Sequence, residues 1–217
     1  MAGRFEVMII ATGMLTLAFI MACVSTGSNG WVRFEQSGKD PTIISLWADQ
    51  GLFEQCVKTR LRGRAEVSNC YSVSSTYNGQ TQDNWEKAVA GLMVTATVIM
   101  GIAVVLSGFL MLSSEGRSGI LSDVSPVIIG NIAAVIAVIA LIIYNSKYES
   151  IRNKLIGVSE KEYVDDEVTF GYSLYVGWLS SFIHFINIFF YFIYKAWAKH
   201  TLEKRRKGKG LVRTTHA

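Results

Sequence analysis

The chain has 217 residues, half of them hydrophobic, with two prolines and a formal net charge of +4. Its apolar residues are gathered into four blocks that contain no Asp, Glu, Lys or Arg. This distribution argues against a soluble globular protein, because four such helices would leave too little polar chain to cover them. The excess positive charge belongs to the C-terminal tail, so it does not indicate nucleic-acid binding.

The four blocks predict membrane-spanning helices. Crossing about 30 Å of hydrocarbon takes ~20 apolar residues in a helix, and each block is long enough. The blocks are Val7–Trp31, Ala88–Ser114, Val124–Ser146 and Val168–Tyr194. They place the spans at about residues 7–27, 88–112, 125–145 and 170–194 of a single domain, residues 1–217. The alternative for the first block is a cleaved signal peptide, but the block is long for one, and its loss would leave an odd number of spans.

Basic residues predict the orientation. With an even number of spans, both termini lie on one side of the membrane. Residues 1–6, 113–124 and 195–217 carry ten Lys or Arg against four acids, whereas residues 28–87 balance seven with seven and residues 146–169 have four against six. Because Lys and Arg beside a span favour the cytoplasm, the first three segments are predicted to be cytoplasmic and the two loops extracellular.

The short connection at residues 113–124 predicts that the second and third spans are antiparallel neighbours. Pro126 is predicted to lie in the first turn of the third helix, with Asp123 or Ser125 as its N-cap. The loop at residues 146–169 looks helical at first and becomes acidic at Asp165–Glu167.

The first outer loop predicts a small sheet. Strand-like runs occur at Trp31–Phe34, at Thr42–Trp47 and on either side of Cys56 and Cys70. In an oxidising compartment these two cysteines are expected to join. A bridge that closes a loop of about 15 residues stabilises a fold by roughly 3 kcal/mol in the chain-entropy model. Cys23, inside the first span, is predicted to be a small buried hydrophobe.

Two motifs carry a resemblance to a known family. Trp31 follows the first span, and Gly51-Leu52-Phe53 precedes Cys56 and then Cys70, an order that resembles the claudin-superfamily signature W…GLW-x-x-C…C. The segment "FGYSLYVGW" (Phe170–Trp178) is similar to the claudin segment E-x-G-x-x-L-[YF]-x-G-W at the start of the fourth span. The order of spans and loops matches as well, so the resemblance covers nearly the whole chain. It departs from the family at Phe53, which replaces the usual tryptophan, and in the absence of cysteines from the tail.

The resemblance implies a mainly α membrane protein, in which a left-handed four-helix transmembrane bundle carries a small extracellular β-sheet. It also implies that the signature residues build the extracellular fold and are not catalytic. Leu52 and Phe53 are expected to form an apolar plug that holds the sheet between the helix ends, with Gly51 allowing a tight turn. Trp31 is expected at the membrane interface, with its apolar body down and its indole N–H in polar surroundings.

No set of residues predicts catalysis, a metal site or a cofactor. His184 lies inside the fourth span whereas His200 and His216 lie in the tail, so they do not converge on one site. As the one ionisable residue inside a span, His184 is a functional candidate by default. The alternative is a neutral histidine that is hydrogen-bonded between helices.

Four cations alternate along the predicted strand after Cys56: Lys58, Arg60, Arg62 and Arg64. On an extended strand this spacing places them on one face. If that face lined a gap between cells, it would favour anions within about a Debye length, ~8 Å at physiological salt. The alternatives are an ordinary solvated face, or pairing with Glu54 and Glu66 that cancels the field.

Two functions fit these features. By resemblance, the chain is a claudin-like plasma-membrane protein of cell–cell junctions, which contributes to paracellular barrier or adhesion and associates with copies of itself in cis and in trans. The alternative is an auxiliary, gamma or stargazin-like subunit that modulates the trafficking or gating of an ion channel or receptor. Gly177-Trp178 and the lack of Asn-x-Ser/Thr sequons favour the junction.

The C-terminal tail adds two predicted partners. The basic segment Glu203–Gly210 is expected to contact anionic membrane lipids, although it could equally serve only as the flank of the last span. Thr215, two residues before the end, predicts a weak PDZ-domain ligand, with Ala217 as a poor terminal anchor.

Overall fold

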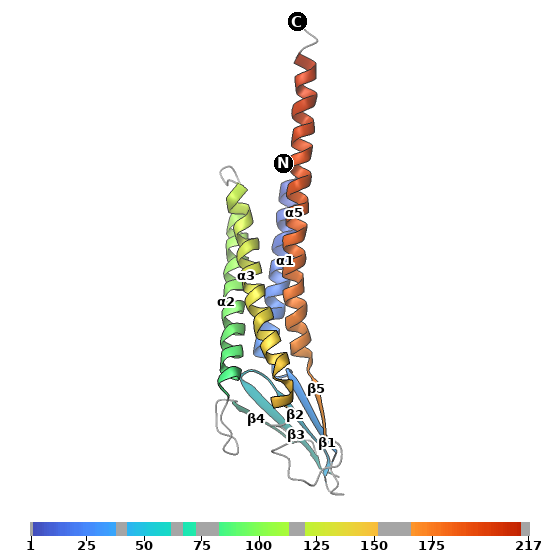
Figure 1. Cartoon of the computed structure of the whole chain (residues 1–217). Coiled ribbons are helices and arrows are strands. Elements are labelled where there is room, and N and C mark those ends of the chain that lie inside the picture. Colours follow the sequence, from blue (N-terminus) through green and yellow to red (C-terminus); the bar gives the residue numbers. More distant parts are fainter. Residues whose placement is uncertain are drawn as a thin grey trace.

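Four long helices form a bundle, and a five-stranded antiparallel sheet covers one end of it (Figure 1). The structure is a computed structural model that describes residues 2–37, 43–61, 67–72, 83–112, 120–151 and 166–213. In chain order the elements are α1 (Ala2–Gly27), β1 (Val32–Ser37), β2 (Ile43–Gln50), β3 (Glu54–Leu61), β4 (Val67–Ser72), α2 (Asn84–Leu112), α3 (Ile120–Ser146), β5 (Asp166–Phe170) and α5 (Tyr172–Arg213). The predicted fold class, a mainly helical membrane protein with a small sheet, is confirmed.

The helices are arranged in a ring. α1 packs against α2 and α5, and α3 packs against the same two helices. The buried side of α1 carries Ala11, Leu15, Ala18 and Ala22, a spacing of three and four residues that keeps mostly small side chains on one face. Small side chains allow neighbouring helix backbones to approach closely, which is how helices associate where no water drives them together.

The outer surface of the bundle is apolar. Large side chains such as Ile20, Val105 and Phe189 are exposed along it. Within the part of the chain that the structure describes, four segments are long and apolar enough to cross a membrane: Met8–Gly27, Asn84–Leu112, Ser125–Ser146 and Tyr172–Ile193. An apolar exterior on helices of this length suits hydrocarbon as the surrounding solvent.

The sheet has the order β4-β3-β2-β1-β5. Residues alternate between its faces, as in any strand. Val32 and Phe34 of β1, with Ala48 and Val168 beside Phe34 on β2 and β5, are buried on the face toward the helices. Arg33 and Glu35 occupy the intervening positions and therefore lie on the outer face.

The second loop contributes a strand that sequence analysis did not predict. Asp166–Phe170, expected to be acidic loop and the start of the fourth span, forms β5 and pairs along β1 from Val32 to Gln36. The edge of β1 would otherwise present unpaired backbone groups. Residues 148–151 are helical, as expected for the start of this loop, and the Tyr148 hydroxyl donates a hydrogen bond to the Val168 carbonyl of β5.

Two helix boundaries differ from expectation. α3 begins at Ile120, so Pro126 lies inside the helix, and Asp123 and Ser125 are helical residues instead of caps. The prediction was wrong because Ser-Pro is a frequent helix start, and here the apolar Ile120 and Leu121 extend the helix before it. α5 continues past the membrane segment to Arg213 and projects beyond the other three helices (Figure 1).

Candidate functional site, the outer sheet and its anchorage

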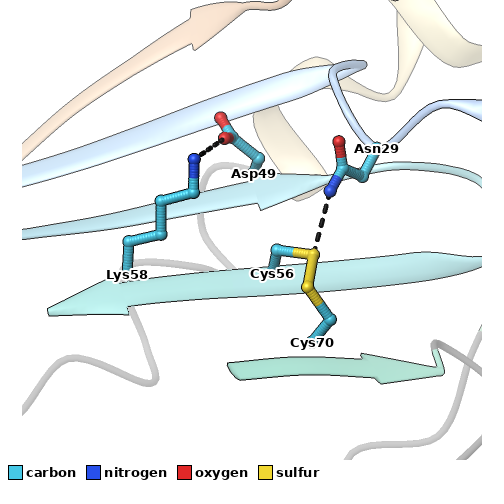
Figure 2. The surroundings of a disulfide bond; sticks show 5 residues. All are labelled: Asn29, Asp49, Cys56, Lys58 and Cys70. Atoms are coloured by element: carbon cyan, nitrogen blue, oxygen red, sulfur yellow. Dashed lines mark hydrogen bonds and ion pairs between the residues drawn. A yellow bond between two sulfur atoms is a disulfide. The ribbon is translucent and has the colours of Figure 1, made fainter. Parts of the chain in front are cut away.

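The two outer cysteines form the expected disulfide. Cys56 on β3 and Cys70 on β4 lie directly opposite one another in the ladder and are bonded (Figure 2). The Cys56 sulfur also accepts a hydrogen bond from the Asn29 amide at 2.9 Å. Asn29 lies in the segment between α1 and β1, so the bridge fastens β4 to β3 and also contacts the chain where it leaves the membrane helix.

Trp31 is a buried anchor between the sheet and the bundle. Its side chain is fully buried, and its indole Nε1 donates a hydrogen bond of 2.6 Å to the carbonyl of Ser25 in α1. Its ring meets that of Tyr144 edge-on, with 4.8 Å between centroids. The side chain is enclosed by protein because β1 and β5 cover this end of the bundle, and its depth relative to the membrane interface stays a prediction.

Only part of the predicted apolar plug is buried. Leu52 is buried, but Phe53 is 45% exposed. The two residues are adjacent at the β2–β3 turn, so their side chains leave the backbone in different directions. The prediction that Phe53 is part of the plug was wrong for that reason. Packing among the described residues does not call for a tryptophan at this exposed position.

Gly51 is needed for space. A Cβ atom at this position would lie 2.6 Å from the Asn29 Cα and 2.6 Å from the Ser28 carbonyl oxygen. Its own N–H bonds the Glu54 carbonyl across the turn at 2.8 Å. The turn between β2 and β3 therefore presses against the exit of α1, where only a residue without a side chain fits.

A second close approach joins α1 to α5 and was not predicted. Gly30 and Gly171 cross with their backbones in contact. Gly171 N–H donates to the Trp31 carbonyl, and Ser173 N–H donates to the Gly30 carbonyl, both at 2.9 Å. The second bond satisfies one of the amides that a helix start leaves without a partner. The signal was present as Gly171 in the segment that resembles the family, but its partner could not be identified from one sequence.

Hydroxyl groups reinforce this crossing. The Ser25 hydroxyl donates to the Ser173 carbonyl at 2.7 Å, and the Ser28 and Ser173 hydroxyls share a bond of 2.6 Å. Gly177, one turn further along α5, faces the same serine of α1: a Cβ there would lie 2.7 Å from the Ser25 hydroxyl oxygen. The glycine of the Gly177-Trp178 motif thus permits close packing of α5 on α1.

Asp49 connects three strands on the outer face of the sheet. Its carboxylate accepts a hydrogen bond of 2.9 Å from Arg33 Nε on β1 and lies 3.9 Å from Lys58 Nζ on β3 (Figure 2 shows the second pair). The hydrogen bond to Asp49 raises the pKa of Arg33 above its ordinary value. Lys58 is therefore partly neutralised by Asp49, an acid that the sequence analysis did not single out.

The structure describes little of the remaining cationic strand. Arg60 lies on β3 at the position paired with Ser45, while Arg62 and Arg64 fall outside the described residues, as does Glu66. The terminal segment with Thr215 and Ala217 also falls outside them. The charge-selectivity and PDZ hypotheses for these residues stay predictions.

Two residues of the membrane helices differ from expectation. Cys23, predicted to be buried, is a free cysteine on the exposed side of α1. The stripe that packs inward includes Ala18 and Ala22, and Cys23, the next residue, is turned about 100° away from Ala22 around the helix. His184 is fully buried in α5, but neither of its ring nitrogens has a hydrogen-bond partner among the described residues, so the expected interhelical bond is not made.

Comparison with known proteins gives a family. No curated protein matches the sequence. The family model described as PMP-22/EMP/MP20/Claudin matches residues 5–191, which include all four membrane segments up to Tyr191 and the whole outer sheet. A bundle of four apolar helices with a disulfide-bridged sheet agrees with that match, and the chain therefore belongs to the PMP-22/EMP/MP20/Claudin family.

Proposed function

We propose that this protein is a claudin-like component of cell–cell junctions in the plasma membrane. Both termini lie in the cytoplasm, in accordance with the distribution of Lys and Arg. The outer sheet contacts copies in the same membrane and on the opposing cell, and the resulting row of molecules seals or tunes the space between cells.

The rigid attachment of the sheet carries this proposal. The turn at Gly51 and the crossing of Gly30 with Gly171 fix the sheet to α1 and α5 by backbone contact. The buried Trp31 and the Cys56–Cys70 bridge hold its inner face and its far strands. A surface that is already ordered before binding loses less conformational entropy on association. This smaller loss of entropy matters most where many weak contacts form between opposed membranes.

The ion pairs of Asp49 reduce the number of cations to which we assign the proposed charge selectivity. Asp49 offsets Arg33 and Lys58. We therefore assign the proposed preference for anions to Arg60, Arg62 and Arg64, with Lys58 as a structural cation. Their potential acts within about 8 Å at physiological salt.

Imaging in junction-poor epithelial cells tests the function. Tagged protein is expressed in half of a mixed monolayer, and the expected result is enrichment only where two expressing cells meet. Contacts between an expressing and a non-expressing cell are the internal control. Diffuse surface signal at both kinds of contact, with an ion channel or receptor that co-purifies, would contradict the junction proposal and favour an auxiliary subunit. Terminal tags that are detected only after permeabilisation would verify the orientation.

A further inference from the structure

Three polar side chains lie deep inside the bundle, away from the outer sheet. They are His184 and Asn187 on α5 and Asn131 on α3. His184 and Asn187 are completely buried, and Asn131 is 9% exposed. Counted from the outer ends of their helices, they lie roughly 18 to 22 Å deep at 1.5 Å per residue, in the interior of a hydrocarbon layer about 30 Å thick.

The helix segments that carry these side chains lie close together. Gly130, the residue before Asn131, is so close to α5 that a Cβ there would lie 3.1 Å from His184 Nδ1 and 2.9 Å from Leu15 Cδ2 of α1. Asn187 follows His184 by one helical turn, and its amide nitrogen donates to the Ala11 carbonyl of α1 at 3.1 Å. Helices α1, α3 and α5 thus meet at this depth.

The orientation of both amides is determined by their bonds. Asn131 Nδ2 donates to the Val127 carbonyl at 2.8 Å, and Asn187 Nδ2 donates to the Ala11 carbonyl. A carbonyl can only accept, so each amide must turn its nitrogen toward it and its oxygen away. Both Oδ1 atoms are buried without a hydrogen-bond partner among the described residues, and so are Nδ1 and Nε2 of His184.

The unpaired groups are chemically complementary. A neutral imidazole provides one N–H donor and one acceptor nitrogen, and each amide oxygen is a further acceptor. An unpaired polar group in hydrocarbon is costly, and no bulk water reaches this depth. Water can donate twice and accept twice, and a buried water typically makes about three bonds to groups of this kind. A phosphate, a carboxylate or a metal ion would meet no opposite charge in this cluster, because each of its three side chains can be neutral.

We propose that His184, Asn131 and Asn187 form a hydration site that holds ordered water inside the membrane-spanning bundle. The water receives the imidazole N–H and donates to the amide oxygens. It joins α3 to α5, while the bond from Asn187 joins α5 to α1. Gly130 keeps the site accessible to His184 by leaving room for its ring. The three helices are then held in register by hydrogen bonds as well as by small-residue packing.

Nuclear magnetic resonance on the full-length protein tests the site. The chain has three histidines, and the variant H200Q/H216Q leaves His184 as the single imidazole. The protein is labelled with 15N-histidine and 15N-tryptophan and placed in phosphatidylcholine bilayers, and magnetisation transfer from water to the imidazole N–H is measured. The expected result is transfer to His184 several-fold faster than to the Trp31 indole N–H, which is equally buried but bonded to a protein carbonyl.

Variants of the two asparagines refine the test. N131L and N187L each remove one amide oxygen and are expected to slow the transfer to His184 several-fold, while formation of the Cys56–Cys70 bridge reports that the outer domain still folds. If either variant fails to fold, the measurement on H200Q/H216Q alone decides. Transfer as slow as that of Trp31 would overturn the proposal. A coupling across a direct hydrogen bond from His184 to Asn131 or Asn187 would also overturn it.

Discussion

Gly171 lies against Gly30 so closely that a Cβ atom on Gly171 would be 2.6 Å from the Gly30 carbonyl carbon. The crowding is asymmetric. A Cβ on Gly171 meets backbone atoms of Gly30, whereas a Cβ on Gly30 meets side-chain atoms, among them the ring of Tyr172 and the hydroxyl of Ser173. Tyr172 is exposed, so its ring can move aside at small cost, but the backbone of Gly30 is held by its bond to Ser173.

Replacing Gly171 by alanine is therefore expected to be more harmful than replacing Gly30. Overpacking typically costs about 1–3 kcal/mol, and a clash with fixed backbone lies at the upper end. Surface biotinylation and thermal unfolding in detergent should show low abundance for G171A and a smaller loss for G30A. Y172A should partly restore G30A but not G171A, because it removes the ring that obstructs Gly30 and leaves only the Ser173 hydroxyl near the added Cβ atom.

Helical glycines in open space provide the matched control. A Cβ atom added at Gly13 or Gly91 would have no neighbouring atom within 4 Å. Alanine there is expected to be neutral or slightly stabilising, since glycine costs about 1 kcal/mol relative to alanine inside a helix. Equal behaviour of G13A and G171A would contradict the explanation by backbone contact.

Loss of the disulfide is expected to weaken the outer sheet. Cys56 and Cys70 are separated by 14 positions, and a loop of this size corresponds to roughly 3 kcal/mol. C56S/C70S should reach the surface poorly and expose the sheet to added protease, because β4 is an edge strand and β3 is its one neighbour in the described sheet. C23S removes the free cysteine on the outside of α1 and should behave like the native protein. Protease resistance of C56S/C70S equal to that of C23S would count against this role of the bridge.

Two substitutions of Trp31 separate the contribution of its hydrogen bond to stability from that of its packing. W31F keeps an aromatic ring but loses the bond to Ser25 and is expected to cost about 1–3 kcal/mol. W31A also empties the space beside Tyr144 and should cost about 3–5 kcal/mol. The midpoints of thermal unfolding should follow the order native, W31F, W31A. Identical midpoints for the two variants would mean that the ring contributes nothing beyond the bond.

Substitutions of the charged residues on the outer face are expected to change ion selectivity. This prediction rests on the proposed function. D49N should increase the preference for anions, because it releases Arg33 and Lys58 from their partner. Its effect on stability should be small, about 1 kcal/mol or less, since these two side chains are 55% and 40% exposed. The measurement is the dilution potential across a monolayer that expresses each variant.

Two further variants test which cations matter. R60Q/R62Q/R64Q should shift the selectivity away from anions, whereas K58Q should change it less. E35Q is the control for D49N, because Glu35 is exposed on the same face and its replacement removes one negative charge without breaking the bond between Arg33 and Asp49. A larger shift with K58Q than with the triple variant would contradict the assignment to the arginines.

Much of the fold could be predicted because its signals are local. A block of apolar residues is visible in the sequence, and so are the strands around Cys56 and Cys70. β5 could not be predicted, because Asp166–Phe170 is acidic at its start and becomes a strand only by pairing with β1 across more than a hundred residues. Strand formation of this kind depends on a free edge and not on the propensity of the segment.

The sequence predicted several residues of the site but few of the contacts that they make. The motif identified Trp31, Gly51 and Leu52, yet the burial of Trp31 follows from the cover that β1 and β5 provide. Asp49 was not singled out, because an acid in a strand gives no sign of which cations lie on its neighbours. The contact between Gly30 and Gly171 likewise joins residues that are far apart in the chain.

Four residues separate β1 from α1, and a single residue separates β5 from α5. The two strands are neighbours, and they begin and end beside each other at the membrane, where Val32 pairs with Phe170. Tension that draws the sheet outward is consequently divided between two helices and runs along the strands. Strands pulled lengthwise must break their ladder bonds together, whereas strands peeled sideways break them one after another. If the protein joins neighbouring membranes as proposed, a pull between them would load β1 and β5 together along their length.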